Sequence, residues 1–317
     1  ARFKTLADEL KLEAAIQGND FIMVSSGDNY LPGPEFNASL DLGTYFDARA
    51  IGLIGYDALA MGNHDFDAGP VIYAEFIEDT DGNMPPFLSA NLDFSNQAEL
   101  AALEAEGRVA KSIVAETFTG RRIGIIGATT ENLGFISSPG TVIVNEVLPA
   151  VQAEVSKLEA EEVDAIVLIS HLQGIEEDSL LAQSLTGIDI MIAGGGDELL
   201  ANDGDLLLPG DENSVFSSYP IVVTDADGKD VPVVTTKGNY TYLGRLNVEF
   251  DENGEVISFN GSPVRVADES LADGVVEDLQ MLEEVVEPVQ QYVEELNRIR
   301  VATSEVHLVG ERSQIRS

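Results

Sequence analysis

Short apolar runs alternate with amphipathic stretches along the first two thirds of the chain. A helical spacing of apolar residues precedes the continuous apolar run Phe21–Ser26, and this pairing of helix and strand recurs toward residue 200. The pattern predicts strands over residues 21–26, 57–62, 86–92, 164–170 and 188–192, and helices over residues 6–17, 40–55, 70–78 and 148–161 and near residue 180. Such alternation is typical of an α/β fold, in which helices cover the strands.

The remaining apolar pattern is that of β-structure. Residues 111–130 are predicted to form a two-stranded hairpin that turns at Thr119 and Gly120. After Pro209, apolar runs separated by Asp- and Gly-rich turns predict antiparallel strands over residues 219–224, 231–236 and 242–250. The last pattern is helical, over residues 279–299. An interruption is expected near Pro288, because proline lacks an amide N–H and clashes with the preceding turn.

The composition narrows the class of protein. A chain of 317 residues with 44% apolar content can bury one large core or two modest ones. No window holds the roughly 18 uncharged apolar residues that a membrane span requires, so no span is predicted. The absence of cysteine excludes disulfides and cysteine-ligated zinc. Any metal ion must therefore be held by histidine, asparagine and carboxylates.

The chain is strongly acidic. Its formal net charge of −39 repels nucleic-acid backbones, so duplex binding is not expected. A surface of this charge suits a protein kept in high salt, where screening over about 3 Å at 1 M relieves the self-repulsion. A halophilic or marine source is one interpretation, and an ordinary acidic secreted protein is the other, because the acidic residues are spread along the chain.

Three of the predicted strands end in polar corners. The first runs into Asp28, the second into Asn63 and His64, and the strand over residues 164–170 into His171. In open α/β sheets, ligands bind outside the carboxyl ends of the strands, so these side chains can converge although they are distant in sequence. An Asp, an Asn oxygen and a His nitrogen form a mixed ligand set for Mn, Zn or Fe, and a second His beside them could act as an acid.

Each corner also has a purely structural interpretation. A Gly-Asp pair after a strand is commonly a turn, and the Asn and Asp of "GNHD" could bond their own backbones. His171 could simply cap a helix. The specificity of the functional hypothesis therefore comes from the combination of the three corners rather than from any one of them.

The motifs "SSGDNY", "GNHDFD", "SANL", "SHLQG" and "VPVVTTKGNYTYLGRL" resemble the calcineurin-like metallophosphoesterase domain of the 5′-nucleotidase family over roughly residues 1–266. The resemblance implies an α/β fold, a four-layer α-β-β-α sandwich with mixed sheets. It also implies two divalent metal ions bridged by an Asp, and hydrolysis of phosphate esters by metal-activated water. The metal could be Mn, Zn, Fe or Ca, with up to two ions in the complete protein.

By the same resemblance, Asp28 is the bridging ligand, and Asn63 and His171 bind the second metal. His64 and Asp67 form a catalytic dyad that stabilises the phosphoryl group and the leaving oxygen. Asp65 is expected to be a local structural group. The residues that bind the substrate stay unidentified, since the resemblance places the base- and ribose-binding residues in a separate C-terminal domain.

Two departures from the family pattern concern the first metal. The family's opening Asp-x-His motif has no counterpart from Ala1 onward. In "IAGGGDELL", where the family has Gly-Gly-His-x-His or Gly-Gly-His-x-Gln, Gly195 takes the position of the first His and Asp197 that of the last residue. Asp197 is predicted either as an oxygen ligand for a metal or as the N-cap of a helix formed by "ELLA".

These observations predict a metallophosphoesterase-like domain over residues 1–266, a helical linker over residues 267–299 and, over residues 300–317, the start of a C-terminal substrate domain. The expected function is a metal-dependent phosphohydrolase, periplasmic or extracellular, acting on nucleotides or other small phosphate esters. The alternative is a non-catalytic or weakly active relative that binds metal or phosphate ligands. His307, in the tail, is expected to be exposed, and the oligomeric state stays open.

Overall fold

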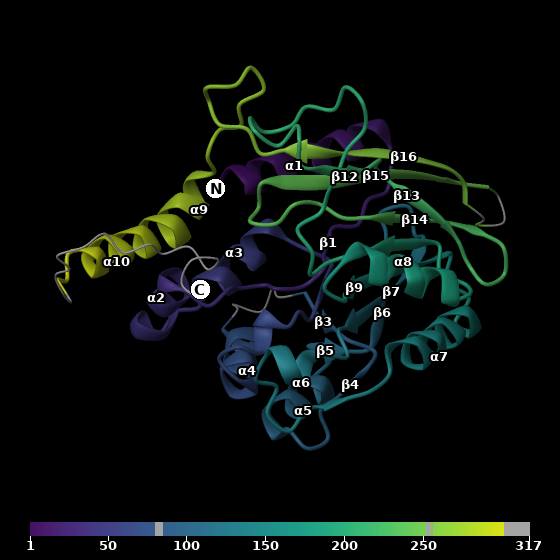
Figure 1. Ribbon diagram of the computed structural model, residues 1–317, viewed down its shortest axis with the longest axis horizontal. Helices are drawn as coiled ribbons and strands as arrows, with labels where there is room; N and C mark the ends of the chain where they lie inside the picture. The colour runs from purple at the N-terminus through teal and green to yellow at the C-terminus, as the bar shows by residue number, and fades with distance from the viewer. Residues whose placement is uncertain (80–84, 252–253, 255, 301–317) are drawn as a thin grey trace, which may run out of the picture.

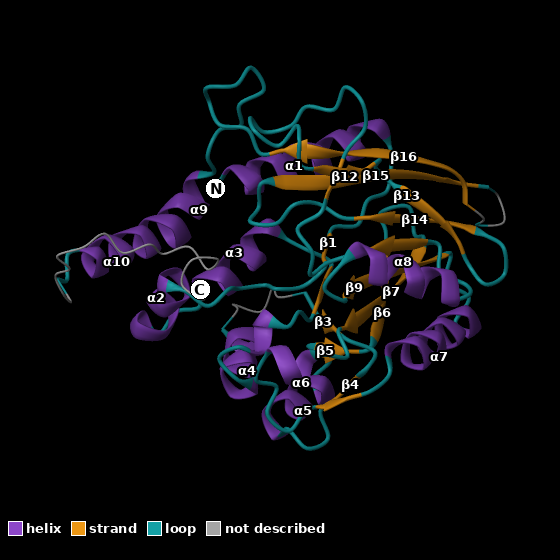
Figure 2. Cartoon of the chain, in the orientation of Figure 1, coloured by secondary structure: helices purple, strands orange, loops and turns teal. Residues whose placement is uncertain are grey.

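Two β-sheets form the centre of the molecule, and helices lie on their outer sides (Figure 1, Figure 2). The computed structural model describes residues 1–79, 85–251, 254 and 256–300. The first sheet has the order β1-β2-β3-β5, and all its paired strands are parallel. Its strands are β1 (Val24–Ser25), β2 (Ala58–Ala60), β3 (Phe87–Leu88) and β5 (Val109–Ala110). Strands β1, β2 and β3 lie within the runs predicted over residues 21–26, 57–62 and 86–92 but are shorter, and β5 was not predicted.

The second sheet has the order β13-β14-β10-β9-β7-β6 and is mixed. Its strands are β13 (Ile221–Thr224), β14 (Asp230–Val234), β10 (Ile190–Ile192), β9 (Ala165–His171), β7 (Arg122–Thr129) and β6 (Ser112–Glu116). The four inner strands are parallel, and the two edge strands run antiparallel to their neighbours. The hairpin predicted over residues 111–130 is confirmed, whereas the expectation of mixed sheets holds for this sheet only.

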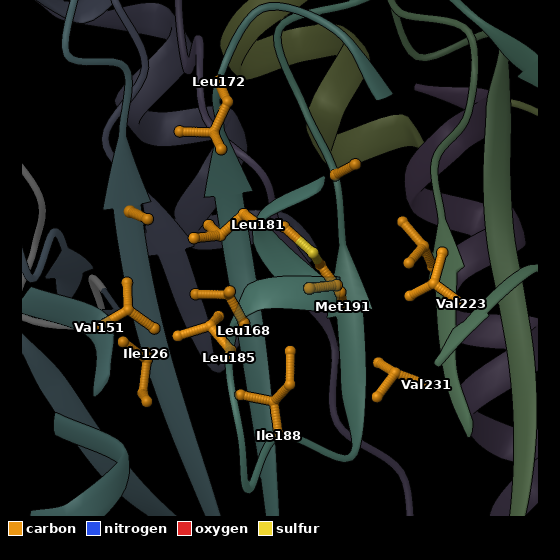
Figure 3. Close-up of a cluster of buried hydrophobic side chains, with 14 of the residues drawn as sticks. Ile126, Val151, Leu168, Leu172, Leu181, Leu185, Ile188, Met191, Val223 and Val231 are labelled. Atoms are coloured by element: carbon orange, nitrogen blue, oxygen red, sulfur yellow. The ribbon is translucent and has the colours of Figure 1, made fainter. Parts of the chain in front are cut away.

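Strands β7 and β9 are buried on both faces, which explains their nearly continuous apolar sequences. Ile125 and Ile169 belong to a cluster that also contains Ala58 and Leu88 of the first sheet. Because side chains alternate along a strand, Leu168 points to the opposite face and joins the cluster of Figure 3. The two sheets thus pack against each other through one layer of apolar side chains, and each buries its other face under helices.

The helices complete the sandwich. The α-helices up to residue 184 are α1 (Arg2–Gln17), α2 (Pro34–Leu42), α3 (Phe46–Ile54), α4 (Pro70–Glu78), α5 (Ala98–Ala105), α6 (Leu133–Ile136), α7 (Val147–Ala160) and α8 (Ile175–Ser184). Buried residues of α7 and α8, such as Val151 and Leu181, cover the second sheet (Figure 3). Ile51 of α3 and Tyr73 of α4 cover the first. The four-layer α-β-β-α sandwich is confirmed.

The single helix predicted over residues 40–55 is wrong. Two helices, α2 and α3, occupy this stretch, and Gly43 ends the first of them with a left-handed φ of 68°. Glycine adopts this conformation without the steric cost that a Cβ would bring, so it terminates a helix whose apolar pattern would otherwise continue.

Three small sheets lie outside the sandwich. They are β4 (Leu92–Asp93) with β8 (Ile143–Val144), β11 (Leu199–Leu200) with β12 (Val215–Ser217), and β15 (Tyr242–Phe250) with β16 (Val256–Arg265). Strand β11 contains part of "ELLA", so the helix proposed there is wrong. Both leucines are buried, and in so short a run two buried leucines are consistent with a helix as well as with a strand.

The last helical stretch changes its hydrogen-bonding pattern near Pro288, as predicted. It consists of α9 (Leu279–Met281), the π-helical turn η2 (Leu282–Val286) and α10 (Glu287–Asn297). The wider π turn ends just before α10, and the proline lies in the first turn of that helix, where its missing N–H is tolerated. Helix α10 contacts α2, and the Tyr292 hydroxyl donates to Asp41 at 2.6 Å. Residues 301–317, and with them His307 and nearly all of the predicted third segment, lie outside the described part of the chain.

Within the described ranges, no helix combines the length and apolarity that crossing a membrane would require.

Candidate metal and catalytic site

The three polar corners meet at the carboxyl ends of β1, β2 and β9. Strands β1 and β2 run parallel, so their ends reach the same edge. Two glycines allow the closest approach: a Cβ on Gly62 would lie 2.2 Å from the Asp28 Oδ1, and one on Gly27 would lie 2.6 Å from the His171 Nδ1. Glycine is therefore required at both turns, because any side chain would separate the segments.

Asp28, Asn63 and His171 converge on one point. The Nε2 of His171 lies 3.2 Å from Asp28 Oδ1 and 3.1 Å from Asn63 Oδ1. His171 is almost fully buried, and its other ring nitrogen, Nδ1, donates to the Ser26 carbonyl oxygen at 2.7 Å. That hydrogen bond requires the proton of the neutral imidazole to be on Nδ1. The lone pair of Nε2 then faces two oxygen acceptors.

Three electron-rich atoms, one nitrogen and two oxygens, are stable at this distance only if a proton or a cation lies between them. Burial by itself would lower the pKa of His171, but the Asp28 carboxylate and the Ser26 carbonyl oxygen raise it above its ordinary value. A divalent cation would take the place of the added proton. Ligands about 2.1 Å from a metal at right angles lie about 3.0 Å apart, close to the 3.1 and 3.2 Å separations found here. The three residues fit a cation of the Mn, Zn or Fe type.

Gln173 fixes the orientation of the Asn63 amide. Its Nε2 donates to Asn63 Oδ1 at 2.6 Å, so the oxygen of Asn63 rather than its nitrogen faces the site. Gln173 has a positive φ of 91°, uncommon for a residue with a side chain. Gln173 was not predicted as a site residue from the sequence; the signal available was its position two residues after His171 in "SHLQG".

His64 and Asp67 form the predicted pair. His64 is the first residue of the 3₁₀ turn η1 (His64–Phe66), Asp67 follows that turn, and His64 Nδ1 lies 2.5 Å from Asp67 Oδ2. The Ser137 hydroxyl, which the sequence did not single out, donates to the other Asp67 oxygen at 2.7 Å. The backbone N–H of His64 donates to Asp28 Oδ1 at 2.9 Å, which joins the pair to the three converging residues. With Nδ1 engaged, Nε2 of the partly exposed His64 is the nitrogen that can meet a substrate.

Asp65 fastens the two turns together, as its predicted structural role requires. Its carboxylate accepts from the backbone and side chain of Asn29, at 2.8 and 2.9 Å, and from the Gly62 N–H at 2.8 Å. Burial, together with the nearby Asp28 carboxylate, raises the pKa of Asp65 to about 7. The group is fully buried, so it is not accessible to a substrate.

That Asp197 is a metal ligand remains a prediction. It is exposed, and a Cβ on Gly238 would lie 3.2 Å from its Oδ1. It forms no hydrogen bond with the three converging residues in the described part of the chain. There, too, no group of three His, Cys, Asp or Glu side chains surrounds a cation site. The site found above does not belong to that class, because its third donor is the amide of Asn63.

Comparison with known proteins identifies the family. No model of a known protein family matches the sequence. The chain is 36% identical to the 5′-nucleotidase of Mus musculus over 219 residues, 68% of this chain and 36% of the relative. It is 32% identical to that of Rattus norvegicus over 83% of this chain and 43% of the relative. The solved 5′-nucleotidase precursor of Thermus thermophilus superposes with a TM-score of 0.81 at 32% identity, covering 99% of this chain and 57% of that one.

The chain carries a metallophosphoesterase domain of the 5′-nucleotidase family. A calcineurin-like phosphoesterase of Bacillus subtilis shares the fold, with a TM-score of 0.68 at 19% identity over 93% of this chain and 90% of that one. The chain spans about half the length, or less, of the 5′-nucleotidases that it matches.

Proposed function

We propose that this metallophosphoesterase domain hydrolyses phosphate esters of nucleotides or of other small molecules in a metal-dependent reaction. The observation that carries the proposal is the convergence of Asp28, Asn63 and His171 beside the His64–Asp67 pair. The relatives named 5′-nucleotidase support nucleotides as the substrate class. An apyrase of Tabanus yao, 29% identical over 99% of this chain and 52% of the relative, is a further similar protein.

The roles proposed for the residues follow from their contacts. Asp28, Asn63 and His171 would hold a divalent cation, which supplies positive charge to a phosphate oxygen and lowers the pKa of bound water. Ser26 and Gln173 keep the His171 ring and the Asn63 amide in the orientation that this requires. Asp28 would also be shared with a second ion, for which Asp197 would be a further ligand.

His64 is proposed as the group that meets the developing negative charge. Asp67 accepts from Nδ1 and favours the protonated imidazole, so Nε2 can donate to a phosphoryl oxygen or to the leaving oxygen. Ser137 fixes the second oxygen of Asp67 and so limits its rotation. The pair would thereby stabilise charge without taking part in holding the cation.

The same geometry also supports the alternative function, that of a non-catalytic relative that binds a metal ion. Three ligand atoms around one point would hold one ion, whereas hydrolysis assisted by two metal ions would need ligands for a second ion beside it. In the described residues, one such group of donors is found. Release of phosphate from adenosine 5′-monophosphate, with Mn²⁺, Zn²⁺ or Ca²⁺ added, separates the two functions. A parent protein that binds Mn²⁺ through Asp28 but releases no phosphate would establish the non-catalytic relative.

We further propose a periplasmic or extracellular location and a high-salt environment, for which the charge of −39 is the supporting observation. The division into a phosphoesterase domain to residue 266, a helical linker to residue 299 and a following substrate domain is part of the same proposal. The change from β16 to the helices α9 and α10 supports the first boundary.

A further inference from the structure

The segment of residues 130–137 is attached to the candidate site at both of its ends. At one end, the Thr130 N–H donates to the carbonyl oxygen of His171 at 2.8 Å. At the other, the Ser137 hydroxyl donates to Asp67 at 2.7 Å. Between them, Leu133 is fully buried in the core that covers the first sheet. The segment is therefore fixed both to a proposed metal ligand and to the proposed dyad.

This fixed segment presents apolar side chains to solvent. Phe135 is 91% exposed and its neighbour Ile136 is 43% exposed. A single exposed apolar residue needs no explanation by itself, and Phe118, in the turn of the β6–β7 hairpin, is fully exposed as well. The two phenylalanines differ in their position along β7. Phe118 precedes the strand, whereas Phe135 follows its carboxyl end, where the site lies.

The distance from Phe135 to the dyad is short. Phe135 precedes Ser137 by two residues, so their Cα atoms lie at most about 7 Å apart. The Ser137 hydroxyl in turn contacts Asp67, the partner of His64. A leaving group whose oxygen meets His64 would extend its next atoms over this part of the surface. An exposed aromatic ring held there gives a flat apolar face at little ordering cost, because the backbone beneath it is already fixed.

We propose that Phe135 is a substrate-positioning residue, whose ring packs against the ribose or base of a nucleotide leaving group. The inference rests on the proposed phosphohydrolase function and adds to it a contact for the leaving group within this domain. Because the ring touches the same atoms before and during reaction, it contributes equally to ground-state and transition-state binding. It should therefore alter KM and leave kcat unchanged.

The test compares two phosphate esters in the parent and three variants. For adenosine 5′-monophosphate, Phe135→Ala should raise KM about 3- to 10-fold, the range expected for loss of one ring contact, with kcat unchanged. For glycerol 3-phosphate, which has no ring, KM should change less than about twofold by the same reasoning. Phe135→Tyr, which keeps the ring, should restore the parent KM. Phe118→Ala is the matched control, since β7 places it about 26 Å away, and it should alter neither ester.

The result that overturns the inference is an equal effect of Phe135→Ala on both esters, or none on the nucleotide. A parent protein that hydrolyses neither ester refutes the proposed function instead. Calorimetric binding of adenosine 5′-monophosphate in the presence of Mn²⁺ then decides the inference separately. Binding weakened by Phe135→Ala and retained by Phe118→Ala supports it, whereas equal binding by both variants, or no binding by the parent, overturns it.

Discussion

Gly62 has no side chain, which lets Asp28 lie directly against it, and replacing Gly62 with alanine should displace Asp28. A Cβ at residue 62 would lie 2.2 Å from both the backbone nitrogen and Oδ1 of Asp28, whereas real Cβ atoms essentially never come closer than 3.0 Å. Asp28 must therefore move by about 0.8 Å or more relative to residue 62, with little freedom to do so. Both atoms belong to a turn that Asp65 fastens through Asn29.

A misplacement of about 1 Å can cost about 100-fold in rate, and disturbed ligand geometry about 10- to 100-fold in metal affinity. We expect Gly62→Ala to weaken Mn²⁺ binding, measured by titration calorimetry, and phosphate release within these ranges. Gly52→Ala is the control, since Gly52 lies in α3 and a Cβ there would have no neighbouring atom within 4 Å. Alanine there should stabilise the helix by about 0.5 to 1 kcal/mol. Mn²⁺ affinity of Gly62→Ala equal to that of the parent would refute the reasoning.

Further predictions concern the dyad, the metal content, the surface charge and one buried acid. His64→Ala should lower kcat about 100-fold or more while bound metal, measured by elemental analysis, stays unchanged; unchanged turnover would contradict its role. The dialysed 317-residue chain should hold at most one tightly bound metal ion, and two equivalents would show that Asp197 or another group completes a second site. Raising NaCl from 0.1 to 1 M shortens the Debye length from about 10 to 3 Å, so the melting temperature should rise, and a fall would contradict the role given to the net charge. Burial raises the pKa of Asp178 to about 7. Between about pH 4 and 7, the Asp178 carboxyl is ionised in the unfolded state but still protonated in the folded state. The free energy of unfolding therefore falls as the pH rises. In urea unfolding, Asp178→Asn should reduce this fall, and an unchanged pH profile would contradict the assignment.

The local order of the fold could be predicted from the sequence, because apolar periodicity records which faces a strand or helix buries. Helix α4 begins and ends where its pattern does, at Pro70 and Glu78, and the hairpin of β6 and β7 turns at its Thr-Gly pair. The prediction of a single helix over residues 40–55 was wrong. The apolar pattern continues through this stretch, but the left-handed φ of Gly43 ends the first helix. Short runs such as the one in β11 were ambiguous because two buried leucines suit a helix and a strand equally.

The residue types of the candidate site were also present in the sequence, since Asp28, Asn63, His64 and His171 follow predicted strands and match family motifs. The sequence could not place their atoms. Convergence depends on the packing of two separate sheets and on glycine turns that bring the segments within contact, and both are set by long-range packing. Tertiary structure alone placed Gln173 against Asn63 and Ser137 against Asp67, because each of these hydrogen bonds joins residues at least 70 positions apart. No periodicity in a linear sequence carries that information.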